Sequence, residues 1–215
     1  MFFCPNGIPL IGDSNTKILS KEKINDNLNF SPCLLFLSNM IIEKGVLVLI
    51  EACKILKEKA IKFECHFVGA WTDISEEEFN NKILNNDLTN YIFSHGKKYN
   101  NEKLYFYNSA DIFVFPTFYH NECFPLVLLE AMQFKLPIVS TNEGGIAEII
   151  SDGVTGFIVP KNNASELAKK LELLINKMEL RLQMGMAGKD RYENCFTLER
   201  FENRLSDILK QAIQS

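Results

Sequence analysis

The 215-residue sequence lacks the short motifs that identify several large enzyme classes. No GxGxxG follows its first apolar run and no GxxxxGK occurs, so the usual phosphate loops of dinucleotide-binding and P-loop proteins are missing. A sugar-nucleotide epimerase or another classical Rossmann enzyme would need that glycine fingerprint. There is no GxSxG and no HExxH either, which excludes the acyl-transfer and zinc-protease chemistry that those motifs carry.

The sequence also has no excess of basic charge and no long apolar run. Its 23 Lys and Arg residues stand against 27 Asp and Glu residues, so no basic surface is expected to recruit nucleic acid. No apolar run approaches the roughly 20 residues that span a bilayer, and the N-terminal residues lack the basic region of a signal peptide. We therefore expect a cytoplasmic protein, with any peripheral membrane contact made through a missing domain or a partner.

Metal-binding patterns are absent as well. The six cysteines are dispersed, no CxxC pair occurs, and the spacing of Cys and His residues does not suggest a zinc cluster. There is no Asp-x-Asp pair. Several cysteines lie in apolar runs, where a free thiol packs as a small hydrophobic group. The pattern predicts reduced thiols, no metal and no cofactor.

What the sequence does contain is a series of short apolar runs alternating with longer amphipathic segments, which is typical of βαβ units. The runs lack strict alternation, so each strand should be buried on both faces. The expected strands are residues 33–37, 63–68, 91–93, 112–115, 137–140 and 157–159. With right-handed crossovers, these steps predict an α/β fold with a single Rossmann-like, doubly wound parallel sheet whose ligand lies beyond the carboxyl ends of the strands.

Three segments are expected along the chain. Residues 1–30 offer little apolar surface and are interpreted as an interdomain linker remnant or an edge segment, 31–196 as the sheet domain, and 197–215 as a C-terminal helix. A surface helix is expected to bury Val46, Leu49, Ile50, Cys53 and Leu56. A helix starting at Asn163, with Glu166 three residues on, is expected to bury Leu167, Leu171, Leu174 and Met178. The last helix, from about Thr197, is expected to bury Leu198, Phe201, Leu205 and Ile208.

Three strand-to-helix junctions are candidates for chemistry. The first runs from Ser38 to Gly45 and places Lys44 at a helix N-terminus, where the helix dipole disfavours a cation unless an anion shares the site. A bound phosphate would supply that anion, whereas a solvated lysine before a glycine is the plain alternative. The third runs from Thr141 to Glu148 and contains Gly144-Gly145, a pair that permits close backbone approach but is also common in simple turns.

The second junction runs from Asn121 to Met132. Pro125 suits the first turn of a helix, because its missing N–H has no partner there, so the helix is expected to begin near Phe124 and to offer its free N–H groups to an anion. Glu122 then lies in the loop at the strand end. Glu130 lies inside an apolar helix and should have hydrogen-bond donors nearby, from the protein or from ligand hydroxyls. A capping or ion-pair role is the alternative for both glutamates.

Taken in order, the three junctions resemble the C-terminal, nucleotide-sugar-binding domain of glycosyltransferase family 4, retaining enzymes of the two-domain GT-B architecture. The likeness covers residues 31–215. Glu122 and Glu130 match the family's E-x7-E motif within ECFPLVLLEAM, and the segments SADIFVFPT and STNEGGIAEIISDGVTGFIV also read like the family. The resemblance implies a hexose transfer from a nucleotide diphosphate sugar, with a UDP-sugar favoured, to a glycan or lipid-linked acceptor in polysaccharide biosynthesis.

By this resemblance, Glu122 would contact the transferred sugar, Glu130 the ribose hydroxyls, and Lys44 the diphosphate. The backbone around the second junction would cradle the phosphates or the sugar, and the turn after the third strand would lie against the base. The further substrate-binding candidates are Asn39, Gly96, Lys97, His120, Asn121, Cys123, Phe124, Pro125 and Leu126. His120 is equally interpreted as an exposed loop residue.

The sequence departs from the family in two respects. Asn39 stands where many members carry an arginine, and an amide can hydrogen-bond a phosphate without neutralising it. The segment Pro5-Asn6-Gly7-Ile8-Pro9 resembles the family's interdomain linker, so the acceptor-binding domain is expected to be missing. The chain is then expected to be inactive alone, either as part of an enzyme with an N-terminal acceptor-domain partner or as a nucleotide-sugar-binding fragment or regulatory module. The apolar side of its last helix, which in the family crosses back to the first domain, would be left exposed.

Overall fold

A computed structural model describes residues 4–11 and 31–214. Most of the expected linker segment, residues 12–30, lies outside the described residues. The described chain contains one six-stranded sheet, in which every paired neighbour is parallel. Its strands are β1 (Cys33–Leu37), β2 (Glu64–Val68), β3 (Ile92–Ser94), β4 (Ile112–Phe115), β5 (Ile138–Thr141) and β6 (Gly156–Val159). The six predicted strands are confirmed, with ends that differ by no more than one residue.

The strand order β3-β2-β1-β4-β5-β6 confirms the doubly wound sheet. The chain moves outward from β1 to β3, returns across the sheet and continues outward from β4 to β6. The order therefore reverses between β1 and β4, whose Leu34 and Leu35 align with Ile112 and Phe113. In open α/β sheets this reversal opens a crevice at the carboxyl ends of the strands, which is where ligands bind.

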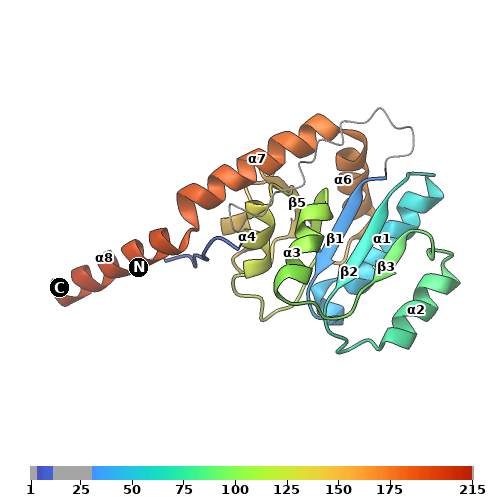
Figure 1. Cartoon of the computed structure of the whole chain (residues 1–215), viewed down its shortest axis with the longest axis horizontal. Coiled ribbons are helices and arrows are strands. Elements are labelled where there is room, and N and C mark those ends of the chain that lie inside the picture. Colours follow the sequence, from blue (N-terminus) through green and yellow to red (C-terminus); the bar gives the residue numbers. More distant parts are fainter. Residues whose placement is uncertain (1–3, 12–30, 215) are drawn as a thin grey trace.

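Helices cover both faces of the sheet. They are α1 (Val46–Glu58), α2 (Glu76–Asn85), α3 (Asn100–Ser109), α4 (Leu126–Gln133), α5 (Ile146–Ile149), α6 (Ala164–Asn176), α7 (Met178–Cys195) and α8 (Leu198–Gln214), with a short 3-10 turn, η1 (Ile42–Lys44), before α1. In Figure 1, α3 and α4 lie in front of the sheet. Helix α1 packs against α6, and α7 packs against α4.

The core lies between these layers and the sheet. Leu34, Leu35 and Phe36 are fully buried in succession, which confirms that β1 is covered on both faces. The ring of Phe36 lies 5.2 Å from that of Phe67 and 6.3 Å from that of Phe115, so aromatic contacts join the three central strands. The expected buried side of α1 is also confirmed. No helix among the described residues is both long and apolar enough to cross a bilayer.

Two predicted helix details are wrong. Helix α4 begins at Leu126, not near Phe124, and Pro125 is its N-cap with ψ 107°. Pro125 itself keeps an extended backbone, and the residue before a proline is sterically disfavoured in the helical region, so the first helical residue is Leu126. Met178 does not continue the buried side of α6, because α6 ends at Asn176 and Met178 is the 42%-exposed first residue of α7.

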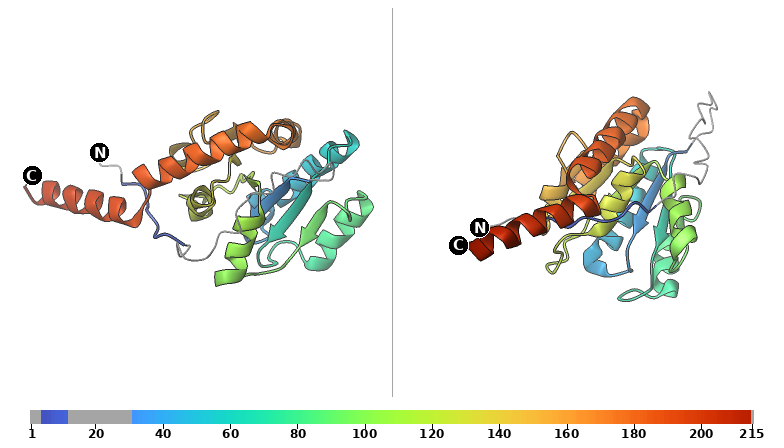
Figure 2. Two further views of the ribbon diagram at one scale, coloured as in Figure 1. Left: turned by 45° about the horizontal axis from the view of Figure 1, so that its top comes forward. Right: turned by 60° about the vertical axis from the view of Figure 1, so that its left-hand side comes forward.

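Helix α8 forms where it was predicted, but it does not bury the expected side chains. Leu198 and Leu205 are exposed, and Phe201 and Ile208 are only half-buried. In both views of Figure 2 the helix extends away from the sheet, so the rest of the described chain leaves most of its apolar side uncovered. The exposed fractions of Leu209 and Ile213, 54% and 85%, agree with the expectation of an exposed apolar side. The segment around Ile8 lies at the base of α8, where it pairs with Thr197.

Candidate functional site

The loops that follow β1 and β4 meet at the reversal of the strand order. Gly45, between η1 and α1, has φ 89°, and a Cβ built on it would lie 2.3 Å from the carbonyl oxygen of Pro116. Only a glycine allows this backbone approach. The carbonyl of Glu43 accepts hydrogen bonds from the Phe118 amide at 2.7 Å and from the Thr117 hydroxyl at 3.3 Å. The first and second junctions are therefore held together by their backbones.

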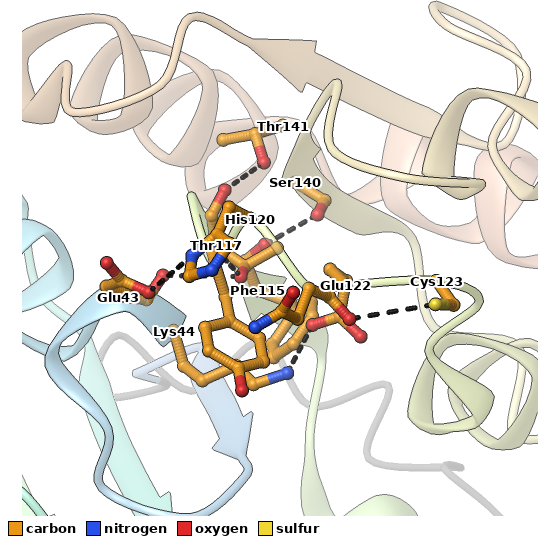
Figure 3. A network of polar contacts seen from close by, with 11 residues as sticks. Glu43, Lys44, Phe115, Thr117, His120, Glu122, Cys123, Ser140 and Thr141 are labelled. Atoms are coloured by element: carbon orange, nitrogen blue, oxygen red, sulfur yellow. Dashed lines mark hydrogen bonds and ion pairs between the residues drawn. The ribbon is translucent and has the colours of Figure 1, made fainter.

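The third junction is attached to the same point. The Thr141 hydroxyl donates to the carbonyl of Thr117, and the Ser140 hydroxyl donates to the carbonyl of Phe115 at 2.5 Å (Figure 3). All four residues are buried. These bonds link the carboxyl ends of β4 and β5, so the loops after β1, β4 and β5 form one structural unit.

The glycine pair of the third junction packs on the loop that carries Glu122. Gly144 has φ 51°, and a Cβ there would lie 1.7 Å from the carbonyl oxygen of Glu122. The Gly145 amide donates to the carbonyl of Cys123 at 2.6 Å. The glycines thus act through close backbone approach, which was one of the two interpretations of this motif.

Replacing Gly144 by alanine is expected to lower the free energy of unfolding by about 2–4 kcal/mol, because strained φ and a backbone clash are combined. Gly153 is a matched control, since its φ is 74° and a Cβ added to it would have no atom within 4 Å. Gly153→Ala should cost only the strain, about 1–2 kcal/mol. Urea denaturation measures both values. Equal losses in the two variants would show that Gly144 does not support the Glu122 loop.

Lys44 and Glu122 form an ion pair at the centre of this unit (Figure 3). Their side chains are only 14% and 8% exposed. The Lys44 ammonium also lies 4.5 Å from the ring centroid of Tyr119 and 5.5 Å from that of Phe115. Lys44 closes the 3-10 turn immediately before Gly45, the N-cap of α1, so it lies close to its predicted position. A shielded lysine at the crevice is chemically suited to an anion, since little solvent screens its charge.

Glu130 has the nearby donors that the sequence predicted, and they are protein groups. Lys103 Nζ lies 2.7 Å from Oε1 and 2.6 Å from Oε2 of Glu130, and the Tyr107 hydroxyl donates to Oε2 at 2.6 Å. Burial, and then the charge of Glu130, raise the pKa of Tyr107 well above its ordinary value. Both partners come from α3, and neither was predicted from the sequence. Their spacing of one helical turn was the available signal.

The turn after β3 contains a histidine pair. His66 Nδ1 and His95 Nε2 are 2.8 Å apart, and the two rings are nearly parallel with centroids 5.0 Å apart. Burial, followed by the charges of His66 and Lys98, lowers the pKa of His95. At neutral pH His95 is therefore uncharged, and its ring anchors the following Gly96 and Lys97 to the sheet.

The remaining predicted residues are more exposed. His120 lies 3.4 Å from Glu43 with 73% of its side chain exposed, which agrees with the alternative of an exposed loop residue. Asn39, Lys97, Asn121, Cys123 and Leu126 are exposed, Gly96 and Phe124 are half-buried, and Pro125 is buried. The ring of Phe124 contacts that of Phe196, with ring centroids 6.0 Å apart.

A hydrogen bond from Lys161 lowers the pKa of Glu143, beside the glycine pair. Within the described ranges, no three His, Cys, Asp or Glu residues are grouped so as to hold a metal ion.

Comparison with known proteins gives consistent matches. Residues 17–191 match the model of the family described as glycosyl transferases group 1. The capsular polysaccharide biosynthesis glycosyltransferase CapM of Staphylococcus aureus is 30% identical over 197 residues, which cover 89% of this chain and 50% of CapM. The chain thus spans about half the length of the curated relatives it matches.

Two solved structures have a similar fold. The C-terminal domain of LpcC, a group 1 family glycosyl transferase from Francisella tularensis, is 26% identical with a TM-score of 0.69, over 78% of this chain and 87% of that one. HepE from Anabaena, solved in complex with UDP-glucose, is 19% identical with a TM-score of 0.73, over 84% of this chain and 49% of HepE. The likeness to HepE concerns the fold.

Proposed function

The chain belongs to the group 1 glycosyltransferases, and from this premise we propose that it is the donor-binding domain of a retaining enzyme that uses a nucleotide diphosphate sugar. The family membership supports glycosyl transfer. The assignment to glycosyltransferase family 4, and to the C-terminal half of a GT-B fold, rests on the E-x7-E motif and on the likeness to the C-terminal domain of LpcC.

The meeting of Lys44 and Glu122 at the reversal of the strand order carries the proposal. An ammonium has three N–H donors, so Lys44 can bind Glu122 and a phosphate oxygen together. As the glycosidic bond breaks, negative charge develops on the leaving diphosphate, and a shielded lysine offsets that charge without a metal ion. The free N–H groups in the first turn of α4 add to this stabilisation.

The other candidates fit around the diphosphate. Glu122 would accept hydrogen bonds from the transferred hexose, Glu130 from the ribose, and the turn of residues 95–98 would contact the base. UDP is the favoured nucleotide, because HepE binds UDP-glucose on the same fold. The acceptor, a glycan or lipid-linked saccharide, would be bound by a separate N-terminal domain and would attack from the face of the sugar that the diphosphate leaves. Residues 31–196 would form the donor domain, with 197–215 as its C-terminal helix.

Replacing Glu122 by glutamine is expected to remove most of the affinity that the hexose adds to UDP, a loss of about 3- to 10-fold for UDP-glucose relative to UDP. UDP itself should bind as well as before or a few-fold more tightly, because Lys44 loses a competing carboxylate. Calorimetric titration with the two ligands tests both statements.

Glu143→Gln is the matched control, since Glu143 pairs with Lys161 and does not contact Lys44. It should leave the ratio of the two affinities unchanged. An equal loss of UDP and UDP-glucose affinity in Glu122→Gln would indicate a collapsed loop and remove the support for sugar contact. A wild-type chain that binds UDP-glucose without any transfer in the presence of an acceptor domain would instead be a regulatory module.

A further inference from the structure

The Tyr107 hydroxyl is a buried donor with one principal acceptor. Tyr107 is fully buried, and its hydroxyl lies 2.6 Å from Glu130 Oε2 and 3.4 Å from the carbonyl oxygen of Val127. A carboxylate can only accept, so the phenol must be the donor. The raised pKa of Tyr107, caused by burial and by the charge of Glu130, keeps this proton in place throughout the neutral range.

The ring that carries this hydroxyl is held on both sides. It lies nearly parallel to Phe134, with centroids 5.2 Å apart and an angle of 9°, and it stacks on Phe113 at 5.9 Å. Phe113 belongs to β4 and Phe134 is the C-cap of α4. The hydroxyl is therefore fixed relative to the sheet and to the helix that carries Glu130.

Lys103 provides the second, more exposed constraint on the same carboxylate. Its ammonium bridges Oε1 and Oε2 of Glu130, and the side chains are 25% and 15% exposed. A carboxylate offers about four acceptor positions. The two protein donors occupy about three of them, which leaves Glu130 one free acceptor direction whose orientation they set.

The Glu130 cluster also connects two parts of the proposed donor site. Helix α3, with Lys103 and Tyr107, begins just after the turn of residues 95–98, and α4, with Glu130, begins just after the loop of Glu122. The first segment is proposed to contact the base and the second the sugar. A ribose lies between the base and the diphosphate in any nucleoside diphosphate. The Glu130 cluster is therefore placed to contact the ribose of a nucleotide bound in the proposed site.

We propose that Tyr107, assisted by Lys103, is a positioning residue that orients the Glu130 carboxylate toward the ribose 2′-hydroxyl, and that this contact makes the site selective for ribonucleotides. The inference rests on the proposed function. It assigns Tyr107 a role in specificity beyond packing. A Glu130 carboxylate that rotated would keep its charge but would no longer be oriented to accept a hydrogen bond from the ribose 2′-hydroxyl.

The test compares the affinities of UDP and 2′-deoxy-UDP by calorimetry. Wild type should prefer UDP by about 10-fold, which is the value of one charge-assisted hydrogen bond. Tyr107→Phe removes the hydroxyl and keeps the ring, and should reduce this preference to about 3-fold or less. Tyr105→Phe is the matched control, since Tyr105 lies on the same helix with 66% of its surface exposed, and it should keep the full preference.

A double variant separates positioning from packing. In the Glu130→Gln background, Tyr107→Phe should change the UDP preference no further, because the carboxylate that Tyr107 orients is gone. A purely structural role would lower both affinities in parallel and leave their ratio unchanged. Should Tyr107→Phe unfold the chain, Lys103→Met applies the same test at a partly exposed position and should lower the preference at least 2-fold.

Three results have distinct meanings. A wild-type chain that binds neither UDP nor its deoxy form contradicts the proposed function and the inference together. A wild type that binds both equally contradicts the inference alone. A full UDP preference in folded Tyr107→Phe, or in Lys103→Met where Tyr107→Phe unfolds, would also overturn the inference, while the proposed function would stand.

Discussion

A polypeptide of these 215 residues is expected to bind a nucleotide diphosphate sugar and to transfer no detectable hexose to an acceptor. In the proposed site Lys44 and Glu122 would supply groups for the donor, and among the described residues they lie on loops at one edge of a single sheet. Transfer also needs an acceptor hydroxyl held at the reacting carbon and water kept out. Orientation of this kind is worth about 7–11 kcal/mol of barrier, so the donor site alone should be nearly inactive.

The measurement is transfer of labelled hexose from UDP-glucose to a saccharide acceptor, with the chain alone and with a separately expressed N-terminal half of a group 1 relative. We expect partial recovery of transfer in the mixture. The exposed side of α8, with Leu205, Leu209 and Ile213, offers an apolar surface for such a partner. Leu209→Glu should weaken the recovery without changing UDP binding. Efficient transfer by the chain alone would contradict the assignment as a donor domain.

Lys44→Ala is expected to weaken UDP binding by about 10- to 100-fold, because a charge-assisted hydrogen bond contributes about 1.5–3 kcal/mol. Uridine, which has no phosphate, should bind as it does to wild type. The loss has a second source, since Glu122 is only 8% exposed and would face the diphosphate without its lysine. Calorimetry with UDP and uridine at low and at high salt measures these effects.

Two further variants serve as a control and as a test of the unpaired Glu122 carboxylate. Lys54→Ala removes a lysine from the exposed side of α1 and should leave both affinities unchanged. The double variant Lys44→Ala/Glu122→Gln should recover part of the lost UDP affinity, because the unpaired carboxylate is neutralised. Equal losses for UDP and uridine in Lys44→Ala would remove this residue from the phosphate site.

The sheet could be predicted from the sequence because its strands are short apolar runs without alternation, such as residues 33–37, and only burial on both faces explains that pattern. Helix ends were harder to predict from the sequence, since they depend on the competing backbone preferences of a few neighbouring residues. Helix α4 begins at Leu126 because Pro125 keeps an extended backbone and the residue before a proline disfavours the helical region. Helix α6 ends before Met178, and Arg181 donates to the last carbonyls of α6, at Leu174 and Ile175, from the next helix.

The candidate site was predicted in outline only. Strand-to-helix junctions identify Lys44 and Glu122, because parallel strands bring their carboxyl ends to one edge. An ion pair was the alternative role for Glu122, but its partner could not be predicted, since Lys44 and Glu122 are 78 positions apart and meet only through the β1–β4 pairing. Glu130 was expected to need donors, but Lys103 and Tyr107 come from another helix. Their spacing of one helical turn shows that they share a side of α3, and the contacts between α3 and α4 then identify them as the donors.

Hydrogen–deuterium exchange of the 215-residue chain with and without UDP tests the proposed donor site, because it locates the ligand on the backbone. We predict slower exchange in three segments: residues 43–47, around Lys44; residues 118–130, with Glu122 and the start of α4; and residues 95–104, with the turn after β3 and the start of α3. The amides of α8 should exchange at unchanged rates. Protection that is absent from the Lys44 and Glu122 segments, or that appears only at α6 and α7, would contradict a donor site at the reversal of the strand order.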